Sequence, residues 1–188
     1  MPEPSTSEPS TPDRILDALE RLLTDSNASQ VSISAVAAEA GVSKGGLLHH
    51  FPTKEAMLAA LVRRLGERSD AQLSAAVAGG TSVANFYLQT YDDSDQASLG
   101  LFRSIIAALR STDAPTGRDD GGEGEVHAAV VEMMRSWDSG LQTEITDPVQ
   151  AEVVRLVGDG LFLAALLGLP QPDPELHRAV VERILPTE

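Results

Sequence analysis

The chain has 188 residues, of which 42% are hydrophobic and 22% are charged, as is ordinary for a soluble protein with a sizeable core. It contains no cysteine, which excludes disulfides, thiolate metal sites and cysteine nucleophiles. It also lacks an apolar run of about 18 residues and an amino-terminal secretory signal, so we expect a cytoplasmic protein with no membrane partner.

The formal net charge of -14 argues at first sight against binding to nucleic acid, but the charge is unevenly distributed. Residues 13–64 carry six basic and six acidic side chains, whereas residues 65–188 carry eight basic and twenty acidic ones. The two lysines of the chain, Lys44 and Lys54, flank one short segment. Exposed charges are screened beyond about 8 Å at physiological salt, so a distant acidic region need not prevent a local contact with phosphate.

We expect an all-α chain of about nine helices, because apolar residues recur at helical spacing and no segment alternates with a period of two. Residues 1–10 predict a disordered tail, since they are rich in Pro, Ser and Glu and have no apolar periodicity. Thr11 and Pro12 then predict the cap and first turn of the first helix. Residues 82–91 predict another helix further along the chain.

Residues 32–51 have the layout of a helix-turn-helix. The first helix begins at Ser32, and Ala37 and Ala40 give it a small-residue face across which a second helix can pack closely. Gly41 follows, and glycine is best suited to the left-handed backbone conformation that ends a helix. We therefore expect a tight turn at this glycine, between two short helices.

The second short helix is expected from Lys44 to His50. Ser43 can cap it, and Leu47 and Phe51 lie four residues apart, so both should point into the core. In a helix-turn-helix such a helix enters the major groove of DNA with its amino-terminal end leading. That end carries partial positive charge and free backbone N–H groups, which suit phosphate.

Two glycines, Gly45 and Gly46, stand in the first turn of this helix. Each should cost the helix roughly 1 kcal/mol relative to alanine. We favour a functional reason, close approach of the bare backbone to the groove, over simple tolerance of glycine in a helix start held by tertiary packing. His49 and His50 can donate hydrogen bonds to phosphate, and metal binding by this pair is not expected, because neighbouring residues on a helix do not share a face.

This segment resembles the DNA-binding signature of the TetR family of transcriptional regulators. The alanine pairs, the turn glycine, the Ser-Lys-Gly opening, the His-Phe end and the following Lys-Glu occur in order over residues 32–58. The resemblance covers roughly residues 13–65, and the rest of the chain matches only in helix number and length. It implies a homodimer that binds a double-stranded DNA operator and uses its carboxyl-terminal helices to dimerise and to bind a small-molecule effector.

The resemblance also implies roles for individual residues. Many members have threonine where Gly46 stands and tyrosine where Leu48 stands. That tyrosine commonly touches phosphate, which Leu48 cannot do, and Gly46 can contact a base only through its main chain. The residues expected to contact DNA are Ser32, Ser43, Lys44, Gly45, Gly46, His49, His50 and Lys54.

An effector pocket is expected among the aromatic and methionine side chains of the second half. Apolar pockets with a few polar groups are the usual sites for small ligands. Taken one by one, most of these residues are more readily explained as core, and only as a group do they indicate a cavity. The candidates are Phe86, Tyr87, Tyr91, Phe102, Arg103, Met133, Met134 and Trp137.

A dimer interface is expected on the last two predicted helices, which open at Asp147-Pro148 and at Asp173-Pro174. Residues 161–167 are apolar all round, and such a helix must be covered on every side. Burial within one chain would satisfy this rule, but the resemblance favours pairing of two copies in a two-fold four-helix bundle. The candidates are Leu161, Phe162, Ala165, Leu166, Leu176, Val180 and Ile184.

These observations divide the chain into a tail at residues 1–10, a DNA-binding domain at residues 11–65 and a ligand-binding and dimerisation domain at residues 66–188. We expect a repressor that a largely apolar ligand releases from its operator. The alternative is a protein-binding regulator of the same fold with weak or lost DNA binding, which the acidity allows. An enzyme, a metal site and a cofactor are not expected, because the sequence has no Ser-His-Asp spacing, phosphate-binding glycine loop or Glu-x-x-His pair.

Overall fold

The computed structural model describes residues 9–25, 31–89, 96–110 and 124–185, and within these ranges it contains nine helices and no strand. This confirms the all-helical fold expected from the sequence. None of the described helices combines the length and apolar character needed to span a bilayer. The helices are α1 (Thr11–Asp25), α2 (Ile33–Glu39), α3 (Lys44–His50), α4 (Lys54–Ala78), α5 (Val83–Tyr87), α6 (Gln96–Arg110), α7 (Glu125–Glu144), α8 (Pro148–Leu167) and α9 (Pro174–Ile184).

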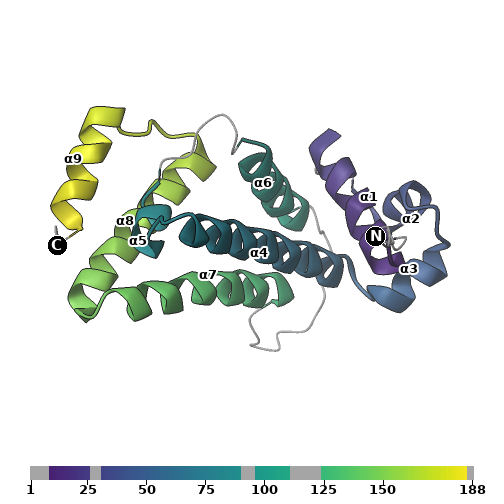
Figure 1. The fold of residues 1–188 in the computed structure, drawn as a ribbon. Coiled ribbons are helices and arrows are strands. Elements are labelled where there is room, and N and C mark those ends of the chain that lie inside the picture. Colours follow the sequence, from purple (N-terminus) through teal and green to yellow (C-terminus); the bar gives the residue numbers. More distant parts are fainter. Residues whose placement is uncertain (1–8, 26–30, 90–95, 111–123, 186–188) are drawn as a thin grey trace, which may run out of the picture.

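The first three helices form a small unit at one end of the molecule, and α4 leads from this unit into a bundle with α5 to α8 (Figure 1). The caps that begin these elements are the expected ones. Ser32, Ser43 and Thr53 each accept a hydrogen bond from the backbone amide three residues later, at 3.2, 3.0 and 2.9 Å. Each of these bonds satisfies an amide that has no partner inside its helix, and so fixes where the helix starts.

The capping residue of α1 differs from the expected Thr11. The backbone amide of Asp13 donates to the hydroxyl oxygen of Ser10 at 3.3 Å, and that hydroxyl donates to the Asp13 carboxylate at 2.5 Å. Because this pair of bonds satisfies the first turn, Thr11 is already helical and Ser10 acts as the cap. Helix α5 is also shorter than expected, since it ends at Tyr87 rather than near Tyr91, which lies outside the described residues.

Helices α4 and α7 run parallel and side by side, as two contacts along their length show (Figure 1). Near the start of both helices, the Arg63 guanidinium lies 3.3 Å from the Glu132 carboxylate. Further along, Gly66 faces Met133, and a Cβ at this glycine would lie only 3.1 Å from the Met133 Cγ atom. The absence of a side chain at Gly66 therefore allows the two helices to approach each other closely.

Two apolar clusters hold the molecule together. The larger one joins α1, α2, α3 and α4 to α6 and the first turns of α7, and its buried members include Leu19, Leu47 and Ile105. The smaller one joins α5, α7 and α8 through Ala84, Tyr87, Leu88, Leu141 and Val154. The larger cluster thus extends from the amino-terminal unit into the second half of the chain.

Helix α5 meets α8 at a glycine. A Cβ at Gly158 would lie 2.1 Å from the Tyr87 Cδ1 atom and 2.8 Å from the Tyr87 backbone oxygen. Both separations are well below any van der Waals contact, so only glycine fits at this crossing. The Tyr87 hydroxyl then donates a hydrogen bond to the neighbouring Asp159 carboxylate at 2.6 Å.

We expect Gly158→Ala to lower the free energy of unfolding by about 1–3 kcal/mol, because the added methyl group must push α5 away from α8. The matched control is Gly100→Ala in α6, where a Cβ would meet nothing within 4 Å. This control should gain up to about 1 kcal/mol through the higher helix propensity of alanine. Urea unfolding of both variants measures the difference, and equal effects would contradict the close crossing.

Candidate functional site

The turn between α2 and α3 is fixed from within the helix-turn-helix and from α1. Gly41 adopts the left-handed conformation with a φ of +65°, as expected. The Val42 amide then donates to the Ala37 carbonyl oxygen at 3.0 Å, which closes the turn. The Arg14 side chain of α1 donates to the Ala40 carbonyl oxygen at 2.8 Å and ties the turn to that helix.

Helix α3 has one buried face and one open face. Leu47 and Phe51 are buried in the larger apolar cluster and anchor the helix, as expected from their spacing. The remaining predicted contact residues lie outward. Ser32, Ser43, Lys44, Gly45, His49 and His50 are exposed, while Gly46 and Lys54 are half-buried.

The two glycines of α3 have different surroundings. A Cβ at Gly46 would lie 3.1 Å from the hydroxyl oxygen of Ser43, the capping residue, so a side chain at this position would crowd the cap. A Cβ at Gly45 would meet nothing within 4 Å. No described neighbour therefore requires glycine at position 45.

The positive charge available on this surface comes from few residues. Arg14 is committed to the turn, and Arg21 of α1 pairs with Glu39 of α2 at 3.0 Å. Partial burial lowers the pKa of Lys54 below its ordinary value. Lys44, at the exposed start of α3, is thus the most accessible cation of the open face.

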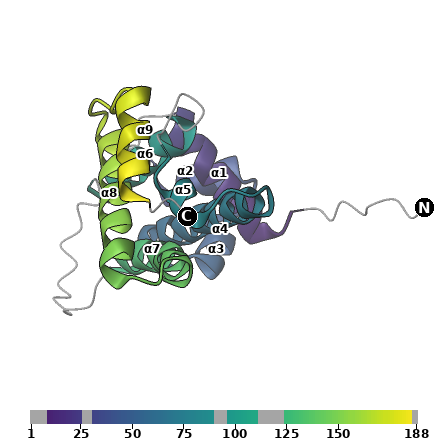
Figure 2. The same cartoon turned by 60° about the vertical axis from the view of Figure 1, so that its left-hand side comes forward.

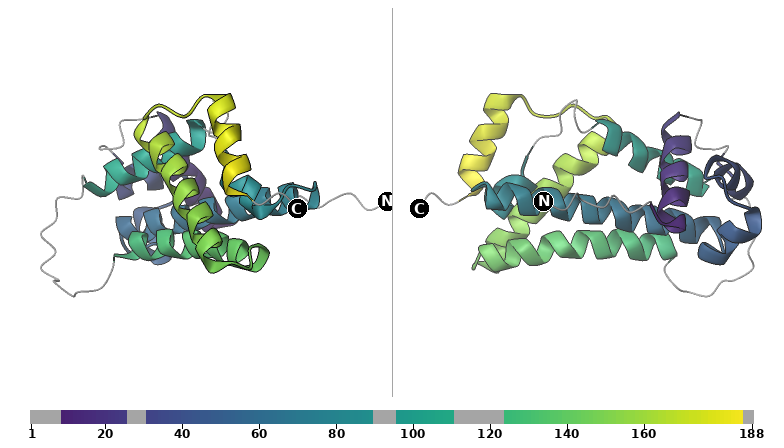
Figure 3. Two further views of the ribbon diagram at one scale, coloured as in Figure 1. Left: turned by 90° about the vertical axis from the view of Figure 1, so that its left-hand side faces the viewer. Right: turned by 45° about the vertical axis from the view of Figure 1, so that its right-hand side comes forward.

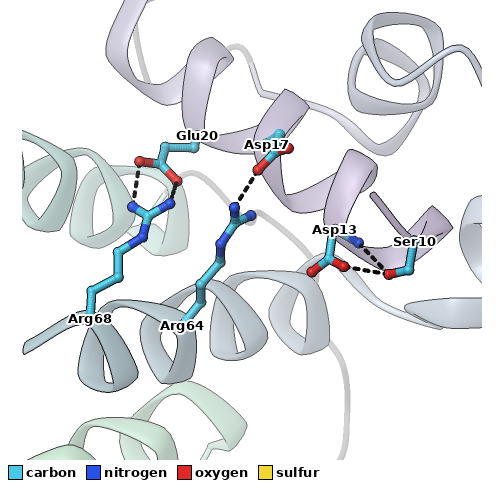
Figure 4. Close-up of polar contacts among 6 residues, drawn as sticks. All are labelled: Ser10, Asp13, Asp17, Glu20, Arg64 and Arg68. Carbon is cyan, nitrogen blue, oxygen red and sulfur yellow. Dashed lines mark hydrogen bonds and ion pairs between the residues drawn. The ribbon is translucent and has the colours of Figure 1, made fainter. Parts of the chain in front are cut away.

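Two arginines of α4 hold α1 in place (Figure 4). Arg64 donates to the Asp17 carboxylate, and one turn later Arg68 donates to both oxygens of Glu20 at 2.7 and 3.0 Å. The hydrogen bond with Glu20 raises the pKa of Arg68 above its ordinary value. Exposed ion pairs of this kind contribute only about 0–1 kcal/mol, so they orient α1 more than they stabilise the fold.

Two hollows lie among α4 to α8, and aromatic side chains line both. The smaller has a volume of about 40 Å³, and its lining includes Tyr87, Met133, Met134 and Asp159. The larger has a volume of about 350 Å³ and an opening to the surface, and its lining includes Leu65, Arg68, Gln72, Phe86 and Leu99. The residues common to both linings are Ser69, Phe102, Trp137 and Phe162.

The predicted pocket residues are only partly gathered there. Those that line one or both hollows are Phe86, Tyr87, Phe102, Met133, Met134 and Trp137. Arg103 lines neither hollow, because its guanidinium donates to the carbonyl oxygens of Leu166 and Ala165 at 2.7 and 2.6 Å. The last carbonyls of a helix lack partners within it, and this arginine supplies them at the end of α8.

Polar groups in the smaller hollow are mostly satisfied by the chain itself. The Asp159 carboxylate accepts from the Tyr87 hydroxyl at 2.6 Å and from Arg155 at 2.7 Å, so its charge is balanced. The Trp137 Nε1 atom is buried, and no described residue accepts a hydrogen bond from it. Sequence reasoning identified Trp137 but missed Asp159, which lies in a helix that the sequence assigned to dimerisation.

Helix α8 has an open apolar face. Figure 2 shows α8 and α9 side by side at the edge of the bundle, and α8 lies in front in the left-hand view of Figure 3. Large apolar side chains recur along α8 at intervals of three, four or seven residues and are between 39% and 70% exposed. They are Val149, Val153, Leu156, Leu163 and Leu167.

The residues expected at the dimer interface differ in how exposed they are. Ala165 is buried within the chain, and the Phe162 ring packs edge-on against Phe102 with their centroids 5.9 Å apart. Leu176 is exposed on α9. Leu161, Leu166, Val180 and Ile184 are half-buried. The all-apolar stretch at 161–167 concealed the outward stripe, which the three- and four-residue spacing from Val149 onward would have revealed.

The chain matches two family models. Residues 81–187 match the model described as "Tetracyclin repressor-like, C-terminal domain". Residues 15–61 match the model described as "Bacterial regulatory proteins, tetR family". The two matches together include α2, α3 and the open face of α8, whereas Leu65, Arg68, Ser69 and Gln72 of the hollows lie between the two matched segments.

Relatives and solved structures agree with these models. An uncharacterized HTH-type transcriptional regulator of Mycobacterium tuberculosis (strain ATCC 25618 / H37Rv) is 31% identical over 121 residues, which are 63% of this chain and 58% of that protein. The chain thus matches less than two thirds of the length of this curated relative. The multidrug binding protein EbrR complexed with malachite green superposes with a TM-score of 0.66 at 25% identity, covering 95% of this chain and 100% of that one. A TetR family member from Streptomyces coelicolor A3 gives a TM-score of 0.65 at 25% identity, with the same coverage.

Proposed function

Because the chain belongs to the TetR family of bacterial regulatory proteins, we propose that it is a homodimeric repressor that releases its operator when a small ligand enters the bundle. The main support for this proposal is that α3 is anchored on one face and exposed on the other. Its inner face is anchored by Leu47 and Phe51, and its amino-terminal turn, with Lys44 and Gly45, is open. A helix held in this way can lie in the major groove of DNA.

The proposed DNA contacts divide by chemistry. Contacts with DNA phosphates position a protein along the duplex. The side chains suited to hydrogen-bond phosphate are those of Ser32 and Ser43, at the two helix starts, and of His49, His50 and Lys54. Lys44 is suited to a base edge or a phosphate, and the bare backbone at Gly45 and Gly46 allows close approach to the groove. The net charge of -14 should keep non-specific binding weak, because that binding depends on neutralising phosphates.

The proposed dimer pairs the open face of α8, together with α9, with the same face of a second copy. The five exposed apolar side chains of α8 have the spacing of one helix face, and a second copy would cover them in a four-helix arrangement. Such pairing is isologous, with the same residues on both sides. It would present two α3 helices for successive major grooves, which lie about 34 Å apart.

The proposed effector site comprises the two hollows and the aromatic side chains common to them. Ligand pockets typically have volumes of about 300–1,000 Å³, so the smaller hollow must expand by movement of Phe102, Trp137 or Phe162 to admit a ligand. The related protein EbrR is complexed with malachite green in one structure, which supports a ligand site in this fold. Coupling between effector and operator is typically worth 1–3 kcal/mol, enough to release DNA.

We expect Lys44→Ala to weaken operator binding several-fold and to reduce the slope of log affinity against log salt by about two per dimer, because each protomer loses one phosphate contact. DNA selected from a random pool serves as the operator, and fluorescence anisotropy across a salt series gives both quantities. The control is Arg135→Ala in α7, which removes the same charge from an exposed position outside α3 and outside the proposed dimer interface. Wild-type affinity in the Lys44 variant would contradict the docking, and failure to select any DNA would favour the protein-binding alternative.

We expect Leu156→Glu to yield a monomer at micromolar concentration, because it places a charge in the centre of the proposed apolar interface. Val77→Glu is the matched control, since Val77 is similarly exposed but belongs to α4, which is not part of the proposed interface. Sedimentation velocity distinguishes the two states. A monomeric wild-type chain, or a Leu156 variant that remains dimeric, would overturn the proposed interface.

A further inference from the structure

The larger hollow has one charged residue among the described residues that line it, and this residue is Arg68. The rest of its lining is apolar, including Leu65 and Leu99, or polar and neutral, including Gln72 and Ser98. A guanidinium beside apolar walls can donate charge-assisted hydrogen bonds to the anionic end of a molecule whose apolar part packs against those walls. The lining therefore suits a molecule that is apolar for most of its length and anionic at one end.

Arg68 also faces the amino-terminal unit. It also lines a second depression, together with Asp17, Glu20 and Arg21. Figure 4 shows its side chain reaching from α4 to the Glu20 carboxylate on α1. Its side chain is 46% exposed and that of Glu20 is 27% exposed, so this ion pair is weak enough to exchange partners.

The smaller hollow does not favour a cation. Its acidic residue, Asp159, already accepts hydrogen bonds from Tyr87 and from Arg155. A cationic ligand would have to displace Arg155 to use this carboxylate. The aromatic side chains of Phe102, Trp137 and Phe162 line both hollows and can hold an apolar body next to Arg68 without any charge of their own.

We propose that the effector is an apolar molecule with a terminal carboxylate or similar anion, and that this anion takes Arg68 from Glu20. The inference rests on the proposed function and assigns the ligand class of the same site. When Glu20 loses its partner, α1 keeps the pair between Asp17 and Arg64 but loses one of its two ionic ties to α4. Because Arg14 connects α1 to the turn before α3, the exchange loosens the orientation of the helix-turn-helix.

The 188-residue chain contains one tryptophan, Trp137, and it lines both hollows, so its fluorescence reports their occupancy. Titrations would use octanoate, octanamide and octylammonium, which share an apolar chain and differ in charge. We expect octanoate to bind at least tenfold more tightly than the other two. Equal affinities, no binding by octanoate, or a preference for octylammonium would overturn the proposal.

Three variants test the competition at Arg68. Arg68→Gln should abolish the preference for octanoate, whereas Glu20→Gln should strengthen octanoate binding several-fold because the competing carboxylate is gone. Arg63→Gln is the matched control, since Arg63 also lies on α4 but pairs with Glu132 of α7. It should keep the wild-type preference. Thermal melts establish that each variant is folded, and an unchanged octanoate affinity in folded Glu20→Gln would contradict the exchange.

The same titrations, repeated with selected DNA, separate the two proposals. A chain that binds DNA but does not prefer octanoate contradicts the ligand class and leaves the repressor function standing. A chain that prefers octanoate but selects no DNA contradicts the repressor function. Release of DNA by octanoate from the wild type, and not from Arg68→Gln, supports both.

Discussion

The packing of α1 between the helix-turn-helix and α4 is the constraint on which the rest of the structure depends. Ile15, Leu19 and Leu23 of α1 are completely or almost completely buried, and the cluster they belong to continues through α4 into Leu101 and Ile105 of α6. Burying a large aliphatic side chain contributes about 1.5–3 kcal/mol, far more than any of the ion pairs around it. The apolar contacts therefore hold α1 in the structure, and the ion pairs determine how it is oriented.

This continuity affects how the amino-terminal unit can move. The sequence indicated a boundary near residue 65, but the larger apolar cluster crosses that position and includes residues of α6 and α7. Helix α4 belongs to both parts, since Leu58 and Leu61 pack in the amino-terminal core while Ser69 lines both hollows. Helix α4 therefore connects the residues that line the hollows directly to those that pack against α1.

The helix-turn-helix could be predicted in detail because its signals are local. Capping serines, the turn glycine and the four-residue spacing of Leu47 and Phe51 each act within a few residues, and the structure contains all of them. The residues that line the two hollows could not be distinguished from core residues in this way. Aromatic residues at helical spacing look alike in a core and at a cavity, and only the fold decides which of them adjoin empty space.

Long-range polar contacts could not be predicted from the sequence, for a related reason. Arg103 is 62 and 63 residues from the two carbonyl groups it binds, and nothing near it in the chain indicates that partnership. The same is true of Arg64 and Arg68, whose partners on α1 lie 47 and 48 residues earlier. In contrast, the outward stripe of α8 was present in the spacing of its residues and was hidden only by the uniformly apolar stretch that follows.

The contact between Gly158 and Tyr87 has a consequence for relatives of this protein. Because a Cβ at Gly158 would overlap both the Tyr87 ring and the Tyr87 backbone oxygen, no change at position 87 alone makes room for a side chain at position 158. A homologue with a side chain at position 158 must therefore hold α5 further from α8, which also changes the distance between the phenol and Asp159. The residue at position 158 should thus sort homologues by the spacing of these two helices and by the shape of the smaller hollow.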